Sequence, residues 1–168
     1  MTGKKTVHKC CWVWDFEKEE RWLNTMAQDG WLLDGVGFCT YHFVGCTPGE
    51  YAVRMEMHPH DEAYTSFMEE TGAEYIGRVF QWVYFRKRVQ NGEFDIFSDL
   101  DSRIAHLNRI GNTLSVVGGA NLLIGLVNTF NNSHLGWINL LCATLLMYAL
   151  GRINGKKEAL QEKRLLQE

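Results

Sequence analysis

Two apolar runs decide the architecture of the chain: TLSVVGGANLLIGLVNTF at residues 113–130 and WINLLCATLLMYALG at residues 137–151. They lie in a stretch of 42 residues, 110–151, without Asp, Glu, Lys or Arg, so the other 126 residues hold all 37 charged side chains. Each run approaches the ~20 residues that an α-helix needs to cross a bilayer core. The polar residues between them are typical of a turn. We therefore predict a transmembrane helical hairpin over residues 112–153, with spans at about 112–130 and 137–153.

The alternative to a membrane hairpin is a buried helical hairpin in a soluble protein. A helix of a soluble protein normally carries a polar face. Neither run has a charged side chain, so the membrane hairpin is the interpretation we favour.

The cations that flank the runs predict the orientation of the hairpin. Arg103 and Arg109 precede the first run, and the connecting turn has no Lys or Arg. The cations that follow the second run are Arg152, Lys156, Lys157, Lys163 and Arg164. The positive-inside rule then places both ends in the cytoplasm. We expect two spans in the cell (plasma) membrane, with residues 154–168 as a cytoplasmic amphipathic tail.

Small and polar residues in the first run are candidates for helix packing. Ser115 and Gly119 have small-xxx-small spacing, and Gly118 adjoins them, which allows two helices to approach closely. Asn121 could hydrogen-bond to another helix. The sequence leaves open whether these residues pack within the hairpin or in a homo-oligomer. No charge marks an ion path, so we do not expect a pore.

Residues 1–90 predict a cytoplasmic α+β domain. Alternating apolar residues indicate strands, and helical spacing with acidic first turns and glycine stops indicates helices. The expected order is a strand at 9–16, a helix at 17–29, a long strand at 31–46 that bends near Gly35 and Gly37, a strand at 51–58, a helix at 61–72, and a strand or bent hairpin at 73–89. This βαββαβ order is that of a ferredoxin-like fold, in which two helices cover one face of a four-stranded sheet.

A linker at residues 91–111 should connect this domain to the hairpin. Ser98 and Asp101 have the spacing of a capping box at the start of a juxtamembrane helix, 99–110. That helix could continue into the first span.

The open face of the predicted sheet is the candidate binding surface. Period-two alternation places large apolar side chains toward the helices and sends polar ones outward. The residues expected on the open face are Asp15, His42, Arg54, Glu56 and Gln81. The bland alternative is a solvated face whose ion pairs contribute little.

The opposite sorting would expose Trp12, Trp14, Trp82 and Tyr84 as a stacking platform for RNA. It would bury three charged residues at a high cost. Residues 1–111 carry 17 acidic and 12 basic side chains, which repel phosphate. We therefore expect no direct binding of nucleic acid.

Cysteine and histidine spacing gives no reason to expect a metal or a cofactor. The five cysteines have no CxxC pair, and structural disulfides are rare in a reducing cytoplasm. We expect small buried thiols, with redox sensing as the alternative. His58 and His60 flank a proline, but no third ligand is evident. Adjacent carboxylates on helices do not face one another, so no catalytic residue is predicted.

Several motifs in order resemble the bacterial domain-of-unknown-function 2812 family. They are WDFEKEE at 14–20 with WLN at 22–24, GW at 30–31, GEY at 49–51, EETGAEY at 69–75, WVYF at 82–85 and FSDLDSRI at 97–104. The resemblance covers roughly residues 8–110, and a hairpin behind it is usual in the family. It implies a membrane-anchored protein of a Gram-positive bacterium, often encoded beside a PadR-like repressor. It supplies no catalytic residues.

The combined expectation is a binding or regulatory protein rather than an enzyme. Its cytoplasmic domain would act in signalling or stress response with a transcriptional-regulator partner such as a PadR-like repressor. The alternative is a small membrane sensor or assembly subunit whose hairpin carries recognition. An enzyme would require a deep pocket with two convergent titrating groups.

Overall fold

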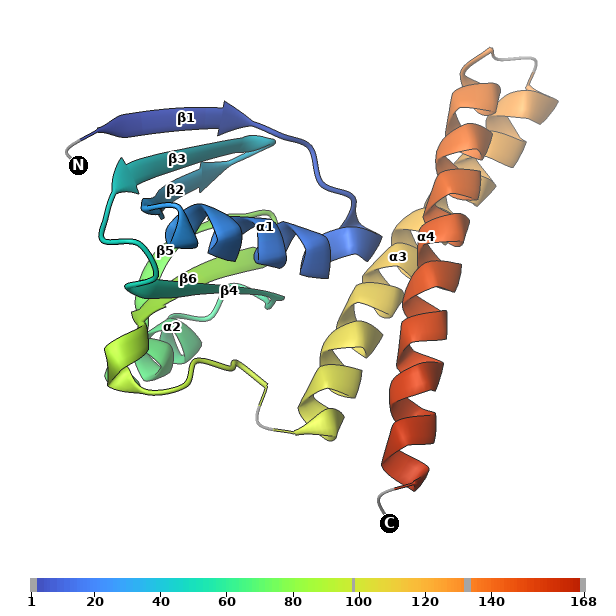
Figure 1. Cartoon of the computed structure of the whole chain (residues 1–168). Helices are drawn as coiled ribbons and strands as arrows, with labels where there is room; N and C mark the ends of the chain where they lie inside the picture. The colour runs from blue at the N-terminus through green and yellow to red at the C-terminus, as the bar shows by residue number, and fades with distance from the viewer. Residues whose placement is uncertain (1–2, 98, 132–133, 167–168) are drawn as a thin grey trace. The chain divides into compact units, whose positions relative to one another are not determined.

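The computed structural model describes residues 3–97, 99–131 and 134–166. The chain divides into two compact units, residues 1–96 and 97–168 (Figure 1). The first unit is mixed α+β, and the second is a pair of long apolar helices.

The first unit contains two antiparallel sheets of three strands each. Their strand orders are β1-β3-β2 and β4-β6-β5. The elements are β1 (Lys4–His8), η1 (Val13–Asp15), α1 (Phe16–Gln28), β2 (Trp31–Gly37), β3 (Thr40–Gly45), β4 (Tyr51–Met57), α2 (Glu62–Glu70), β5 (Glu74–Val79), β6 (Trp82–Arg88) and η2 (Val89–Asn91). The sheets meet where β2 lies beside β5.

These elements form a strand–helix–strand–strand unit that occurs twice, as β1-α1-β2-β3 and β4-α2-β5-β6. The two sheets have the same order of strands. Within the two repeats, six pairs of identical residues recur 42 positions apart: Glu20 and Glu62, Met26 and Met68, Gly30 and Gly72, Gly35 and Gly77, Phe38 and Phe80, and Phe43 and Phe85. The first unit is therefore an internal repeat in both topology and sequence.

The repeated glycines occupy equivalent places in the backbone. Gly30 and Gly72 follow α1 and α2 with φ of 85° and 84°, the left-handed conformation in which glycine commonly ends a helix. Gly35 and Gly77 lie at register shifts in the β2–β3 and β5–β6 pairs. A bulge of this kind bends a strand and increases its twist.

Helix α1 packs on one sheet and protects the edge of the other. Trp22 makes edge contacts with Tyr41 and Phe43 of β3, with ring centroids 5.0 and 5.8 Å apart. The Oδ1 atom of Asn24 accepts a hydrogen bond from the backbone nitrogen of Val53, and its Nδ2 atom donates one to the carbonyl oxygen of Val53. Both donor–acceptor distances are 2.9 Å. Because β4 is an edge strand, these bonds satisfy backbone groups that would otherwise lack partners.

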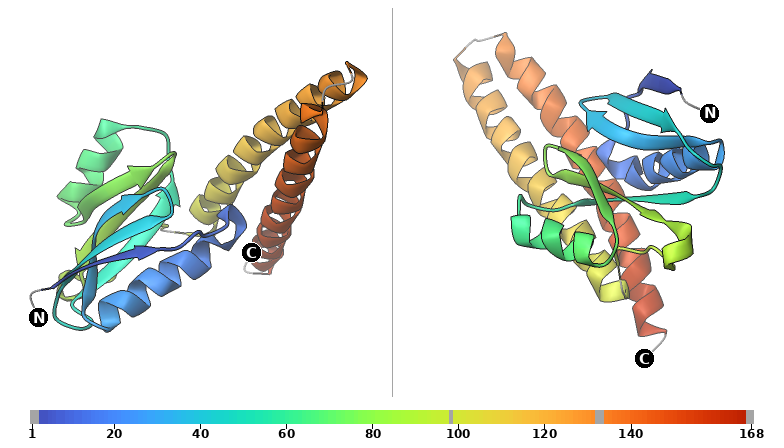
Figure 2. Two further views of the ribbon diagram at one scale, coloured as in Figure 1. Left: turned by 90° about the horizontal axis from the view of Figure 1, so that it is seen from above. Right: turned by 90° about the vertical axis from the view of Figure 1, so that its left-hand side faces the viewer.

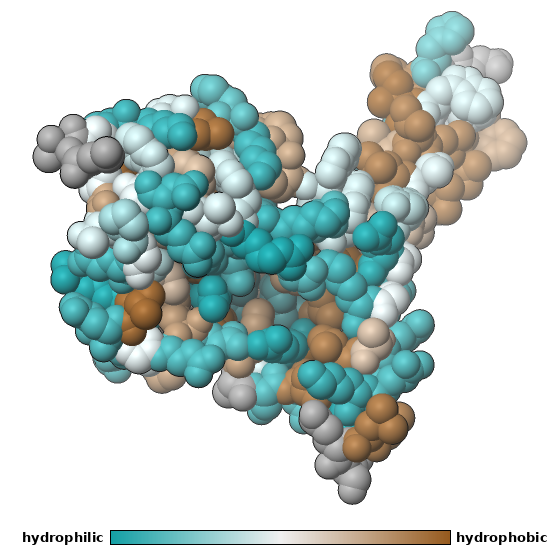
Figure 3. Space-filling model, viewed as in Figure 1, coloured by the Kyte–Doolittle hydropathy of each residue, from teal (hydrophilic) through white to brown (hydrophobic). Residues whose placement is uncertain are grey.

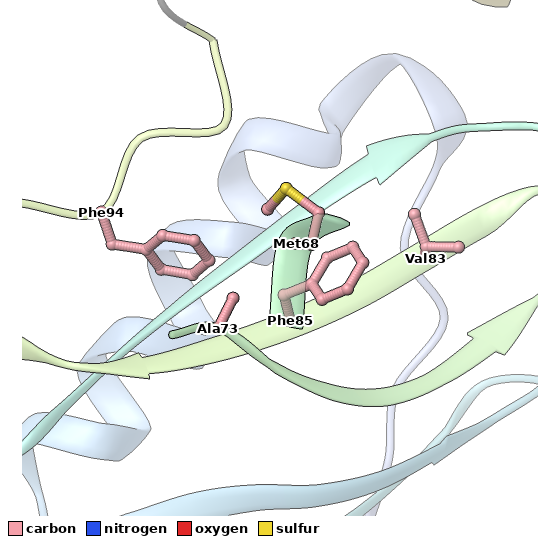
Figure 4. Close-up of a cluster of buried hydrophobic side chains, with 5 residues drawn as sticks. All are labelled: Met68, Ala73, Val83, Phe85 and Phe94. Carbon is pink, nitrogen blue, oxygen red and sulfur yellow. The ribbon is translucent and has the colours of Figure 1, made fainter. Parts of the chain in front are cut away.

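Helix α2 covers the opposite face of the β4-β6-β5 sheet from α1, and Figure 2 shows the strands between the two helices. Here Met68 and Ala73 pack with Val83, Phe85 and Phe94 in a buried cluster (Figure 4). Both faces of this sheet are therefore covered.

The ferredoxin-like order is not confirmed, because six strands form two sheets and the helices lie on opposite faces. Residues 9–16 are not a strand: the Lys9 N–H donates to the Cys39 carbonyl, and the chain then turns into η1. The predicted strand at 31–46 is the β2–β3 hairpin, which turns at Phe38 and Cys39. The bent hairpin at 73–89 and both helices are confirmed, with bounds shifted by a few residues.

The second unit consists of α3 (Leu100–Phe130) and α4 (Leu135–Leu165). Both are long and apolar enough to cross a membrane, and they run side by side in both views of Figure 2. Figure 3 shows apolar side chains gathered over the half of this unit that carries the connecting turn. The juxtamembrane helix is continuous with the first apolar run, and the predicted tail continues α4 to Leu165.

The capping box of α3 lies one residue beyond its predicted position. The Asp99 carboxylate accepts from the Ser102 N–H at 2.7 Å, and the Asp99 N–H donates to the Ser102 hydroxyl. Ser98, which was predicted to cap the helix, is outside the described residues.

The two long helices approach closely at glycines. A Cβ at Gly125 would lie 2.9 Å from the Leu140 side chain and 3.1 Å from its backbone nitrogen, and one at Gly118 would meet Met147. A Cβ at Gly119 would meet nothing within 4 Å. Gly118 therefore packs within the hairpin, whereas Gly119 has space beside it.

Asparagines link the same two helices. The Asn128 amide donates to the Asn139 side chain at 3.4 Å, and the Asn139 amide donates to Asn121 at 3.3 Å. The Ser115 hydroxyl instead donates to the Gly111 carbonyl of its own helix.

We predict that Gly125→Leu destabilises the hairpin by about 1–3 kcal/mol, because the new side chain overlaps Leu140. Gly119→Leu, the matched control, should leave the stability of the hairpin unchanged. The measurement is thermal unfolding of the detergent-solubilised protein by far-ultraviolet circular dichroism. Equal unfolding midpoints for the two variants would contradict the observed packing.

Candidate functional site: an aromatic pocket between the repeats

A cavity of about 200 Å³ lies where the two repeats meet the segment before α1. The β2–β3 turn contributes Phe38, and the β5–β6 hairpin contributes Phe80 and Trp82. Trp12 lines it from the segment before α1, and Phe16 lines it from the first residue of α1. Aromatic side chains thus form most of its walls.

The two hairpin turns place equivalent phenylalanines at the rim of the pocket. Phe38 and Phe80 are 73% and 77% exposed, and their rings meet edge to face at 5.9 Å. Cys39 and Phe80 have positive φ angles of 50° and 53°, a conformation that side chains other than glycine rarely adopt. Backbone conformations of this kind concentrate at functional sites, and here they accompany two adjoining exposed rings.

A buried carboxylate lies beside these rings. Glu19 is in the first turn of α1, and only 7% of its surface is exposed. The hydroxyls of Tyr41 on β3 and Tyr84 on β6 each donate to its Oε1 atom at 2.7 Å. One phenol comes from each repeat, so Glu19 joins the two repeats as well as lining the pocket.

Helical spacing explains why Glu19 points inward. Phe16, Glu19 and Leu23 are all buried and lie three and four residues apart, which places them on one face of α1. Phe16 contacts the Trp82 ring at 5.5 Å between centroids. The acidic first turn predicted from the sequence therefore contains one residue, Glu19, that belongs to the core.

The phenols remain hydrogen-bond donors over the physiological pH range. Burial raises the pKa of Tyr84 and of Tyr41 far above the usual value, and the neighbouring Glu19 adds to both increases. Burial also raises the pKa of the Cys11 thiol, with Glu19 adding to the effect and Lys9 opposing it. Cys11 is therefore protonated at neutral pH.

A disulfide joins Cys10 to Cys39, and Cys39 lines the pocket. The bond joins the segment before η1 to the β2–β3 turn, where the two Cα atoms are 4.6 Å apart. The prediction that all cysteines are free thiols is wrong for these two, because the hairpin at Phe38 brings together residues 29 positions apart. Cys11, Cys46 and Cys142 are free.

The five residues expected on one open sheet face do not share a face. Asp15 lies in η1 and pairs with Lys18 at 2.9 Å. His42 lies on β3, where its ring bonds to Thr6 at 3.1 Å. Gln81 is in the β5–β6 turn. The predicted face depended on a strand at 9–16 that does not form.

Arg54 and Glu56 lie on β4. Arg54 forms an ion pair with Glu20 of α1 at 3.6 Å. Glu56 is only 2% exposed, because it lies opposite Val83 on the face that α2 covers. Neither residue contributes to an open surface of the kind expected.

A second cavity of about 340 Å³ lies near α2 and includes Arg78, Tyr75 and His60. Apart from Val83, its lining is exposed or half-buried. Within the described ranges, no group of three or more Cys, His, Asp or Glu side chains could hold a metal. The aromatic pocket is therefore the stronger candidate site.

The comparisons with known proteins identify one family. A family model described as "Protein of unknown function (DUF2812)" matches residues 15–118. No curated protein and no solved structure matches the chain. The match leaves out β1 and extends from the end of η1 through the second repeat into α3.

We predict that Cys11 reacts slowly with iodoacetamide at neutral pH, because its raised pKa leaves little thiolate. Glu19→Gln removes one cause of that increase and should raise the alkylation rate about two- to tenfold. Glu17→Gln removes an exposed charge from the same helical turn and should have little effect. The rates are measured by peptide mass spectrometry, and equal rates for both variants would argue against the Cys11–Glu19 contact.

Proposed function

Because the chain belongs to a family of proteins of unknown function, DUF2812, we propose a function from its own site. The protein is a membrane-anchored binding protein whose N-terminal unit takes a small organic molecule into the aromatic pocket. The observation that carries this proposal is the buried Glu19 carboxylate beside a cavity lined by aromatic rings.

The composition of the pocket supports ligand binding. Binding sites for small molecules are concave and mostly apolar, with a few fixed polar groups that orient the ligand. The pocket has aromatic walls, and the two phenols fix its one buried carboxylate. A cavity of about 200 Å³ suits a small molecule rather than a peptide segment.

Helices α3 and α4 support a membrane anchor. Their large apolar side chains are exposed between Val116 and Tyr148, which is costly in water and favourable in lipid. The flanking cations support a hairpin with both ends in the cytoplasm. The Cys10–Cys39 disulfide is unusual for a reducing compartment, so in this orientation we propose that cellular thiols can open it.

A regulatory role is part of the same proposal. In this proposal, ligand binding at the rim changes the affinity of the N-terminal unit for a protein partner. The family resemblance supports a PadR-like repressor as that partner. A second candidate role is recognition through the hairpin, which the open space beside Gly119 supports. In that case a second copy or another membrane helix would contact α3 there.

The test uses membranes that contain the full-length protein. We expect the protein to remain in the membrane after an alkaline carbonate wash, because two apolar helices hold it there. Diazirine-tagged aromatic fragments are then photolysed on the washed membranes, and labelled peptides are identified by mass spectrometry. Labels should concentrate in residues 11–16, 37–41 and 79–84.

Two exposed phenylalanines give matched variants for this experiment. Phe80→Ala removes one rim ring and should reduce the labelling. Phe67→Ala removes a 58% exposed ring on α2, outside the pocket lining, and should leave the labelling unchanged. Release by carbonate would refute the anchor, and labelling spread evenly over the surface would refute the pocket.

A further inference from the structure

We propose that the ligand of the aromatic pocket is a small organic cation, with its charged group beside Glu19 and its apolar body against the aromatic rings. This inference rests on the proposed function, since it names the chemical class of the ligand. It follows from the charge, the geometry and the size of the pocket.

The charge of the pocket is unbalanced. Among the described residues that line it, Glu19 is the only one with a charged side chain type, and none is Lys, Arg or His. The ion pairs found in the described part of the chain do not include Glu19. Lys9 lies outside the lining, with its ammonium 4.0 Å from the centre of the Trp22 ring.

The hydrogen bonds of Glu19 fix its side chain in place and supply no opposite charge. Both phenols donate to the same oxygen, Oε1, at 2.7 Å, and an ionised carboxylate accepts such bonds at both of its oxygens. Burying a charge without a counter-charge is costly. A cationic ligand would supply an opposite charge that none of the described residues lining the pocket supplies.

The aromatic walls favour the same class of ligand. Trp12, Phe16, Trp82 and the Phe38–Phe80 pair line the cavity. The negative face of an aromatic ring attracts a cation, and the attraction is strongest for tryptophan. Quaternary ammonium groups suit this environment because they have no N–H donors that would need partners.

The volume of the cavity limits the size of the ligand, and the carboxylate of Glu19 disfavours an anionic ligand. A cavity of about 200 Å³ can hold a trimethylammonium group with one short substituent. An anionic molecule of the same size would meet the Glu19 carboxylate at close range, where like charges repel. The pocket therefore selects by the sign of the charge.

The experiment compares two probes of nearly the same shape. Benzyltrimethylammonium is a cation, whereas N,N-dimethylbenzylamine N-oxide has an oxygen in place of one methyl group and no net charge. Their affinities for the full-length protein in a neutral maltoside detergent are measured by isothermal titration calorimetry. The wild-type protein should bind the cation about tenfold more tightly than the N-oxide.

The side chains of the first helical turn provide the variants. Glu19→Gln keeps the shape of the carboxylate and should remove the preference for the cation. Glu17→Gln makes the same change of charge at an exposed position of α1, and this variant should still prefer the cation. The comparison of the two probes on the wild-type protein does not depend on whether Glu19→Gln folds.

The outcomes separate this inference from the proposed function. Equal affinities for the two probes on the wild-type protein would overturn the cation assignment but leave a ligand pocket. A preference that survives in a folded Glu19→Gln variant would also overturn it. Absence of selective photolabelling at the pocket would instead refute the proposed function itself.

Discussion

The hydrogen bonds from Tyr41 and Tyr84 to Glu19 are the interaction on which the N-terminal unit depends. They join α1 to β3 of the first repeat and to β6 of the second. A buried carboxylate is tolerated only when donors surround it, so the two repeats must be held in one arrangement to supply both phenols. That arrangement also sets the two phenylalanine turns together and leaves the pocket between them.

The other contacts of α1 reinforce the same arrangement. Asn24 and Glu20 hydrogen-bond to the backbone of the edge strand β4, and Arg86 of β6 donates to the Leu33 carbonyl of β2 at 2.8 Å. The seam between the sheets is therefore bridged by side chains where no strand ladder joins them. The disulfide then fixes the segment before η1 at the rim. The result is a cavity in which the hydroxyls of Tyr41 and Tyr84 and the carboxyl group of Glu19 are hydrogen-bonded to one another.

The sequence could predict the hairpin and both short helices because each depends on local chemistry. An acidic first turn and a glycine stop act within a few residues, and the charge-free stretch is continuous along the sequence. The β2–β3 turn was predicted only as a bend near Gly35 and Gly37, because Phe38 and Cys39 at its tip are not usual turn residues. Glu19 looked like a solvated helical acid, since its two phenol partners are 22 and 65 residues away. The glycines and phenylalanines that recur 42 positions apart are the signal that could have revealed the repeat.

A double-mutant cycle between Glu19→Gln and Tyr84→Phe tests the central claim most directly. The free energy of unfolding is measured by urea denaturation of the detergent-solubilised protein, followed by tryptophan fluorescence. Each single variant should lose about 1–3 kcal/mol, because a buried group loses its partner. The double variant should lose less than the sum by about 1 kcal/mol. Additive losses would show that Glu19 and Tyr84 are not coupled, and would contradict a carboxylate held between the two repeats.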